Sequence, residues 1–222
     1  MINPKVITYS DPASIVAEAY RVIRSNIQFS NPDRVLKRIV ITSYGSMEGK
    51  TLTISNLAVA YAYTGKKILL VDADLRKPKV AQIFGMGNDC GLSNLLSGYA
   101  QYQQCIKSTV VKNLHILPGG PASPNPSEML GSDEMVNLLN KLDENYDIIL
   151  LDTPPVGFVT DAQILSTICS GVVLVVASKQ TDTNAALQAK SLLESVNANI
   201  IGVILNRTKA DEKASKYIER YL

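Results

Sequence analysis

The chain has 222 residues, which is enough for one well-buried α/β domain and short for two. Its 22 Lys and Arg residues nearly balance 20 Asp and Glu residues, and a net charge of +2 provides no general attraction for nucleic acid. No apolar run reaches the roughly 18 residues of a membrane span, and the amino terminus lacks the features of a signal peptide. We therefore expect one cytoplasmic domain over residues 1–222 with no nucleic-acid partner.

The cysteines Cys90, Cys105 and Cys169 are widely spaced and form no CxxC pair. An odd number without metal-ligand spacing is typical of a reducing compartment and excludes an obvious zinc or iron–sulfur site. We expect three inert thiols.

The first predicted element is a helix over about residues 12–30. Asp11 stands before a proline, a pairing typical of an N-cap and the first helical residue. Glu18, Arg21 and Arg24 follow at intervals of three residues and share one polar stripe. One interpretation is a solvated surface with an intrahelical Glu18–Arg21 pair. The other is a self-complementary contact with a neighbouring subunit.

Runs rich in Val, Ile and Leu recur along the rest of the chain, separated by helix-compatible segments. Such runs are typical of parallel strands buried on both faces and joined by right-handed crossovers. They cover residues 36–41, 68–71, 114–117, 148–151, 172–176 and 200–205. We predict an α/β fold with a doubly wound, mostly parallel sheet of about six strands or more, flanked by helices. Between the third and fourth runs, Ser127 is expected to cap a helix that continues toward Leu142.

The segment after the first apolar run has the pattern of a phosphate-binding loop. Its Gly49-Lys50-Thr51 turn leads into an alanine-rich segment with helical spacing, so backbone N–H groups and a helix N-terminus face one point. Lys50 would reach the β- and γ-phosphates of ATP, and the Thr51 hydroxyl would ligate Mg²⁺. Tyr44 stands where the usual pattern has its first glycine. The residues expected to contact the nucleotide are Gly45, Ser46, Met47, Glu48, Gly49, Lys50, Thr51 and Leu52.

Asp152 follows the run 148–151 and is a candidate for the metal side of the site. A hydrophobic strand that ends in an aspartate holds magnesium through water in P-loop NTPases. The alternative is a carboxylate that only caps the loop at the end of its strand.

Asp72 and Asp74 end a neighbouring strand, at the same carboxyl edge of the sheet where open α/β folds bind ligands. Two residues apart, they share a face if the extended geometry continues, and both would then point toward the nucleotide. With Asp152 on the metal, binding ATP and a single metal ion does not require both of these carboxylates, so one is left for another role. A surplus carboxylate orients a hydroxyl nucleophile and accepts its proton, while Arg76 or Lys77 would stabilise charge. The alternative is that both acids only pair with Arg76 and Lys77.

Together these motifs resemble the bacterial tyrosine kinases, or BY-kinases, in order over about residues 10–207. The matching segments are Glu18-x-x-Arg21-x-x-Arg24, Gly49-Lys50-Thr51, Asp72-x-Asp74-x-Arg76-Lys77-Pro78, Pro124-Asn125-Pro126-Ser127-Glu128 and Asp152-Thr153-Pro154-Pro155. The resemblance implies a P-loop kinase domain that transfers phosphate from Mg-ATP to protein tyrosines. It also implies autophosphorylation in trans and a role in capsule and exopolysaccharide synthesis and export.

The resemblance also implies a role for individual residues. Asp72 would accept the tyrosine proton, with Lys50 on the phosphates and Asp74 beside them as the other catalytic residues. The implied magnesium ligands are Thr51, Asp74 and Asp152. Asn206, after the last predicted strand, would contact adenine; the alternative is an ordinary turn residue.

Oligomerisation and the substrate tail follow from the same resemblance. Glu18, Arg21 and Arg24 would build a ring-shaped homo-oligomer, an octamer, that presents the tail of one subunit to the active site of the next. The tail, about residues 208–222, carries the candidate phosphoacceptors Tyr217 and Tyr221. Alternatively, these tyrosines pack a terminal helix.

The implied partners are protein substrates, a cognate tyrosine phosphatase and a membrane-embedded activator. The activator would recruit the chain to the inner face of the cell membrane and complete its nucleotide site. Two competing hypotheses are a ParA- or MinD-like ATPase switch and an ATP-binding scaffold of a polysaccharide export complex. The switch usually carries a signature lysine, and Gly45 takes its position here.

Overall fold

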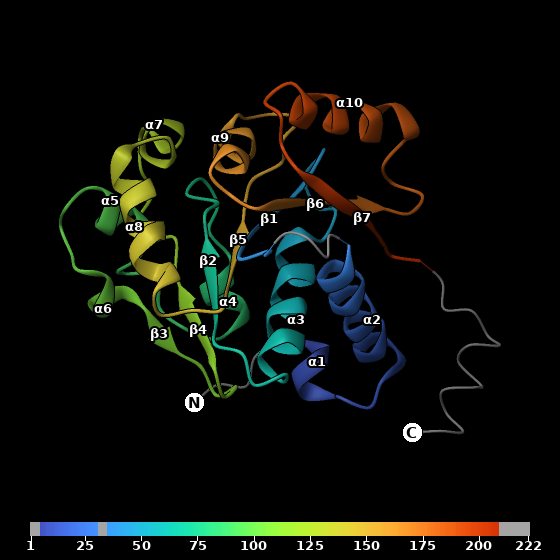
Figure 1. The fold of residues 1–222 in the computed structure, drawn as a ribbon, viewed down its shortest axis with the longest axis horizontal. Coiled ribbons are helices and arrows are strands. Elements are labelled where there is room, and N and C mark those ends of the chain that lie inside the picture. The colour runs from blue at the N-terminus through green and yellow to red at the C-terminus, as the bar shows by residue number, and fades with distance from the viewer. Residues whose placement is uncertain (1–4, 31–34, 209–222) are drawn as a thin grey trace.

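The computed structural model describes residues 5–30 and 35–208 (Figure 1). Helices cover both faces of a single sheet (Figure 1). The strands are β1 (Arg38–Ser43), β2 (Ile68–Asp72), β3 (Lys107–Ser108), β4 (Leu114–Leu117), β5 (Ile148–Asp152), β6 (Gly171–Ala177) and β7 (Ile200–Asn206). The helices are α1 (Ile7–Ser10), α2 (Ile15–Phe29), α3 (Lys50–Ala62), α4 (Val80–Ile83), α5 (Leu92–Leu96), α6 (Tyr102–Cys105), α7 (Pro126–Leu130), α8 (Asp133–Asp143), α9 (Asp161–Thr167) and α10 (Thr183–Glu194).

The strands lie in the order β3-β4-β2-β5-β1-β6-β7, and each neighbouring pair is parallel except β3 with β4. The predicted doubly wound, mostly parallel sheet is therefore confirmed, and each apolar run became a strand. The two-residue strand β3 was not expected. Because β1, β2 and β5 run in the same direction, the segments that follow them meet at one edge of the sheet.

The apolar core has two parts, one on each face of the sheet. Neighbouring residues of a strand point to opposite faces, so Leu69 and Val71 pack on one side while Ile68 and Leu70 pack on the other. Helices α8, α9 and α10 cover the first face, and α2, α3 and α4 cover the second. Each fully buried Leu or Ile side chain contributes about 1.5–3 kcal/mol. This burial on both faces explains why the central strands β2 and β5 have no polar alternation.

The start of the first long helix differs from its prediction. α2 begins at Ile15, and the Ser14 hydroxyl accepts the N–H of Ala17 at 3.2 Å. Asp11 ends the short helix α1 instead, where its backbone N–H donates to the carbonyl of Ile7. The prediction of Asp11 as the N-cap was therefore wrong, because an extra helical turn precedes it.

The predicted helix from Ser127 to Leu142 is two helices. α7 ends at Leu130, and Ser132 then caps α8 through the N–H of Met135. Gly131 lies between them. The side chain of Ser127 does not cap α7, which leaves it available for a contact described below.

The cysteines also differ from their prediction. Cys90 and Cys105 form a disulfide with a Cα–Cα distance of 5.1 Å, and Cys169 is a free thiol. The pairing depends on how α5 and α6 fold back on each other, which the spacing in the sequence does not indicate.

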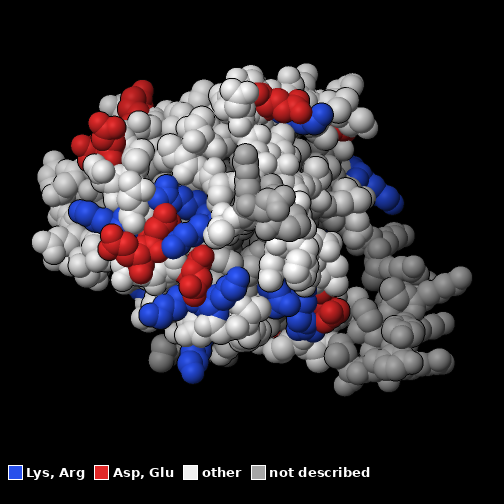
Figure 2. Space-filling model, in the orientation of Figure 1, with Lys and Arg blue, Asp and Glu red and all other residues white. Residues whose placement is uncertain are grey.

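Within residues 5–30 and 35–208, no helix is long and apolar enough to cross a membrane. On the face drawn in Figure 2, basic and acidic side chains lie close to one another. That face has no extended region of one sign, in keeping with the small net charge.

Candidate active site

The phosphate-binding loop joins β1 to α3 at the carboxyl edge of the sheet. Helix α3 begins at Lys50, so Lys50 and Thr51 belong to its first turn. Gly49 precedes the helix with φ +91°, and a Cβ there would lie 2.2 Å from Nδ2 of Asn206. Glycine is therefore required both by the backbone conformation and by the close neighbour.

Side chains from distant segments hold the carbonyl groups of this loop. Asn206 Nδ2 donates to the Glu48 carbonyl at 2.9 Å, and Arg207 Nη2 donates to the Met47 carbonyl at 2.7 Å. Gln180 Nε2 donates to the Ser46 carbonyl at 3.4 Å. Among the described residues, the N–H groups of Ser46 and Met47 have no partner. Free N–H groups beside a helix N-terminus form a favourable binding site for an anion such as phosphate.

Glu48 stabilises the loop from within. Its side chain is buried, and Oε1 accepts the N–H of Gly45 at 2.8 Å. Oε2 is also buried and has no partner in the part of the chain that the structure describes. Sequence reasoning had placed Glu48 only among the nucleotide contacts and had not predicted this contact.

Lys50 lies at the centre of the acidic site. Only 8% of the residue is exposed, and this burial lowers the pKa of its ammonium group. The nearby charges of Asp152, Asp74 and Glu48 act in the opposite direction and favour the charged form. The predicted lysine and acids are therefore close enough to interact.

Asp72 and Asp152 lie directly opposite each other on β2 and β5. Both are buried, and burial raises the pKa of Asp152 to about 7 and the pKa of Asp72 well above its usual range. The charge of Asp152 raises the pKa of Asp72 further. A hydrogen bond from Thr51 and the charge of Lys50 lower the pKa of Asp152.

One oxygen of Asp72 is already used. Oδ2 accepts the backbone N–H groups of Lys79 and Val80, each at 2.9 Å. Within the described ranges, Oδ1 of Asp72 and Oδ1 of Asp152 are buried without a partner. Buried carboxylate oxygens without partners are costly, so they indicate a missing ligand.

Asp74 reaches the site from a loop. The extended geometry that would place Asp72 and Asp74 on one face does not continue, because β2 ends at Asp72 and residues 73–79 form a loop. Asp74 Oδ1 accepts the N–H groups of Arg76 at 3.3 Å and Lys77 at 3.0 Å. The Asp74 charge nevertheless raises the pKa of both Lys50 and Asp152.

Arg76 does not pair with the site acids as the alternative interpretation required. Its guanidinium binds Asp161 through Nε at 3.0 Å and Nη2 at 2.9 Å. Asp161 and Ser127 come from α9 and α7, and neither was a predicted site residue. No motif links Arg76 to an acid 85 residues later, so the pair had no signal in the sequence.

The donor set fits a hydrated magnesium ion. It comprises the Thr51 hydroxyl and the carboxylates of Asp74 and Asp152, with Oδ1 of Asp152 buried and unpartnered among the described residues. In the described residues, no group of three or more His, Cys, Asp or Glu side chains is placed so that it could hold a metal ion by itself. Mg²⁺ is usually held by one or two protein groups, water and substrate phosphates rather than by a protein cage.

The remaining predicted site residues either make contacts with other parts of the chain or lie outside the residues that the structure describes. Asn206 ends β7 against the phosphate loop, and its predicted adenine contact stays a prediction. Arg21 pairs with Glu18 on the same helix, and Arg24 Nη1 donates to the Ala60 carbonyl at 3.0 Å. Tyr217 and Tyr221 lie outside the described residues.

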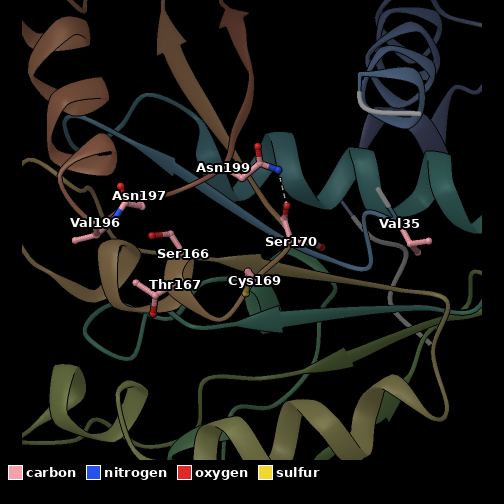
Figure 3. Close-up of a pocket in the computed structure, with 8 residues that line it drawn as sticks. All are labelled: Val35, Ser166, Thr167, Cys169, Ser170, Val196, Asn197 and Asn199. Carbon is pink, nitrogen blue, oxygen red and sulfur yellow. Dashed lines mark hydrogen bonds between the residues drawn. The ribbon is translucent and has the colours of Figure 1, made fainter. Parts of the chain in front are cut away.

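A separate hollow of about 560 Å³ lies at the opposite, amino edge of the sheet (Figure 3). Its lining includes Ser170 and Asn199, which precede β6 and β7. Asn199 Nδ2 donates to the Ser170 carbonyl at 2.7 Å, and Ser170 Oγ accepts the N–H groups of Lys37 and Arg38. The hollow is at the far end of the strands from Lys50, so it is distinct from the phosphate site.

A phosphate loop at a helix N-terminus, with aspartates ending two adjacent parallel strands, defines a P-loop nucleotide-binding protein. Residues 36–208 match the family model described as an AAA domain, and the chain belongs to that family. It is 42% identical over 212 residues to the tyrosine-protein kinase YwqD of Bacillus subtilis, covering 96% of this chain and 89% of that protein. The chain therefore also belongs to the bacterial tyrosine-protein kinases, and it is an enzyme of that class.

Solved structures agree with this assignment. The kinase domain of Escherichia coli tyrosine kinase ETK matches with a TM-score of 0.91 and 29% identity, over 96% of this chain and 83% of that one. The chimerical protein CapA2B2 matches with a TM-score of 0.90 and 43% identity, over 93% and 91%. The septum site-determining protein MinD of Pyrococcus horikoshii, complexed with Mg-ADP, is more distant. Its TM-score is 0.65 at 25% identity, over 82% and 76%.

Proposed function

We propose that this kinase transfers the γ-phosphoryl group of Mg-ATP to tyrosine with Asp72 as the proton acceptor. The observation that carries the proposal is the buried Oδ1 of Asp72, which has no partner among the described residues. Asp72 lies opposite Asp152, and the charge of Asp152 in turn acts on Lys50. Burial raises the pKa of Asp72, and a more basic carboxylate is a better acceptor for a phenol proton. Its other oxygen, held by two N–H groups, fixes its orientation.

The remaining residues of the site bind the nucleotide. The N–H groups of the phosphate loop and the ammonium of Lys50 neutralise the phosphates. Thr51, Asp74 and Asp152 would hold magnesium, which would neutralise phosphate charge in the reaction. Asn206 contacts adenine while its amide nitrogen keeps the loop in place.

The first test replaces the proposed base. We expect Asp72→Asn to lower tyrosine phosphorylation by about 100-fold or more, since the amide cannot accept the proton. ADP affinity, measured with a fluorescent analogue, should change by less than about 3-fold because the phosphate loop is intact. Phosphotyrosine is followed by immunoblot and mass spectrometry after incubation with Mg-ATP.

Asp147→Asn is the matched control for that test. Asp147 lies just before β5, at the opposite end of the strand that carries Asp152, and accepts the N–H of Lys67 at 2.7 Å. This control should keep the wild-type rate. Undiminished tyrosine labelling in Asp72→Asn would contradict the role of Asp72.

A switch ATPase is the second candidate, favoured by the likeness to MinD with Mg-ADP. ATP hydrolysis without label on tyrosine would support it, and neither activity would support an ATP-binding scaffold. Gly45 takes the place of the lysine expected of such a switch.

The partners are proposed from family membership. The chain acts at the inner face of the cell membrane in capsule and exopolysaccharide synthesis, where a membrane-embedded protein activates it and a cognate phosphatase reverses its action. It autophosphorylates in trans within a ring-shaped octamer and also phosphorylates other proteins.

Activation is tested by adding a peptide from the cytoplasmic end of a membrane-embedded candidate partner. We expect weak activity alone and a gain of at least about 10-fold with the peptide, because the partner completes the nucleotide site. A scrambled peptide is the control. Equal rates with and without the segment, at saturating Mg-ATP, would remove this proposal.

A further inference from the structure

Asp161 carries a buried charge that the proposed reaction does not use. It is the first residue of α9, and none of its surface is exposed. Both carboxylate oxygens accept from the guanidinium of Arg76: Oδ2 from Nε at 3.0 Å and Oδ1 from Nη2 at 2.9 Å. This bidentate arrangement fixes the direction of the arginine as well as its charge.

Ser127 completes the arrangement from a third segment. Its hydroxyl donates to Oδ1 of Asp161 and accepts from Nη2 of Arg76, each at 2.9 Å. The contacts join the loop 73–79 to the first turns of α7 and α9. A side chain of the loop is therefore tied to two helices of the main body.

The simplest alternative is that Asp161 only begins its helix. An N-terminal carboxylate usually accepts free N–H groups of the first turn. The hydrogen bonds of Asp161 in the described structure go instead to Arg76 and Ser127, and Thr160 is the N-cap residue. Its contacts therefore serve the loop rather than the start of α9.

Backbone N–H groups of the same loop, together with that of Val80 at the start of α4, orient both catalytic carboxylates. The N–H groups of Arg76 and Lys77 donate to Asp74, and those of Lys79 and Val80 donate to Asp72. A shift of the loop would therefore move both acids. The side chain of Arg76 is the point at which the loop is attached to α7 and α9.

We propose that Asp161 is a positioning residue for tyrosine phosphorylation. It holds Arg76, and through Arg76 the loop 73–79, so that Asp74 faces magnesium and Asp72 faces the tyrosine hydroxyl. This inference rests on the proposed roles of Asp72 and Asp74. Asp161 touches neither substrate nor metal and acts only through the loop.

The test uses Asp161→Asn, which keeps the shape of the side chain and removes its charge. Asp143→Asn is the matched control, because Asp143 also pairs with an arginine: Arg38, at 3.1 Å from Nε and 2.6 Å from Nη2. Arg38 begins β1 at the amino edge of the sheet, away from the phosphate loop. Both variants lose an ion pair with an arginine, but only Asp161→Asn loses a contact with the loop 73–79.

Hydrogen exchange of the ligand-free protein provides a readout that does not depend on activity. We expect the amides of Arg76, Lys77, Lys79 and Val80 to exchange at least about 10-fold faster in Asp161→Asn than in wild type, because local opening releases them. Asp143→Asn should leave this segment unchanged. Equal exchange of these amides in wild type and Asp161→Asn would overturn the proposal.

Kinetics supply the second readout. For Asp161→Asn we expect kcat to fall about 10- to 100-fold and the magnesium concentration for half-maximal binding of a fluorescent ATP analogue to rise about 5-fold. Analogue binding without magnesium should stay at the wild-type level. Arg76→Lys should behave similarly, and the double variant should be no worse than either single one, since both remove one contact.

The outcomes separate this inference from the proposed function. Wild type that labels no tyrosine contradicts the function, whatever the exchange data show. Wild type that labels tyrosine, with Asp161→Asn matching Asp143→Asn in kcat and magnesium dependence, contradicts the positioning role alone.

Discussion

Asp72 and Asp152 hold protons more tightly in the folded, ligand-free protein than in the unfolded chain. Burial raises the pKa of Asp152 from 3.8 to about 7, and burial together with the Asp152 charge raises the pKa of Asp72. The stabilisation from Asp152 protonation is complete below pH 3.8 and is lost as the pH rises through about 7. The raised pKa values of these two acids therefore make the protein less stable at neutral pH than at acid pH when no magnesium is bound.

Asp152→Asn tests this at the scale of the residue. The amide cannot ionise, so we expect the free energy of unfolding of the variant, relative to wild type, to increase between about pH 5 and 8 by on the order of a few kcal/mol. Urea unfolding at several pH values without nucleotide or magnesium measures the difference. Asp147→Asn, which changes the same charge at the other end of β5, is the control. A difference that is independent of pH would contradict the prediction.

At the scale of elements, the junction between β1 and α3 depends on Gly49. Gly49→Ala places a Cβ at φ +91° and 2.2 Å from Asn206 Nδ2. We expect a loss of about 1–3 kcal/mol in stability from backbone strain and the displaced asparagine. Because the loop shape changes, ADP affinity should fall at least about 10-fold. Thermal unfolding and titration with a fluorescent ADP measure the two effects.

Gly65→Ala is the control for this comparison. Gly65 follows α3 with φ +87°, and a Cβ there has no neighbour within 4 Å. It should cost about 1 kcal/mol in stability and leave ADP affinity unchanged. Equal ADP affinity of both variants would show that the close approach of Asn206 has no role in shaping the loop.

The strands could be predicted because burial on both faces leaves a local pattern. Ile148–Leu151 and Ile68–Val71 are apolar at every position, and β1 has an apolar centre at Ile39–Ile41. The two polar residues of β3 have no such pattern and were missed. Helix starts were less certain because several residues suit an N-cap: Ser14 caps α2 although Asp11 precedes a proline.

The residues of the site also fall into two groups, those that the sequence could predict and those that it could not. Asp72 and Asp152 end parallel strands, and Lys50 begins the helix after a third one. Because parallel strands bring their carboxyl ends together, it could be predicted that these residues lie at one edge of the sheet. Asp161 and Ser127 depend on how α9 and α7 pack beside the loop, and the pairing of Cys90 with Cys105 depends on α5 and α6. These contacts arise only from tertiary packing, so the spacing of the residues in the sequence does not predict them.

At the scale of the whole molecule, assembly is tested on α2. Arg21→Ala/Arg24→Ala should convert a large ring into a smaller particle, because both arginines are proposed to contact the next subunit. Mass photometry or light scattering measures the particle mass. An unchanged large assembly would count against the ring contact.

The control for that test is Lys190→Ala/Glu194→Ala, which removes the exposed ion pair of α10. Arg24 also donates to the Ala60 carbonyl of α3, so circular dichroism is needed to confirm that both variants are folded. A smaller particle in the α2 variant alone would support the contact.

The contact of Asn206 with the phosphate loop has a consequence for biosynthesis. The two partners are 158 residues apart in the chain, so the ribosome makes the loop long before the side chain that holds it. At about 5–20 residues per second, the interval is roughly 8–30 s. A nascent chain that stops before β7 has its lysine and its aspartates but lacks the hydrogen bonds of Asn206 and Arg207 to the loop. ATP retention is therefore expected of the finished polypeptide and not of its growing intermediates.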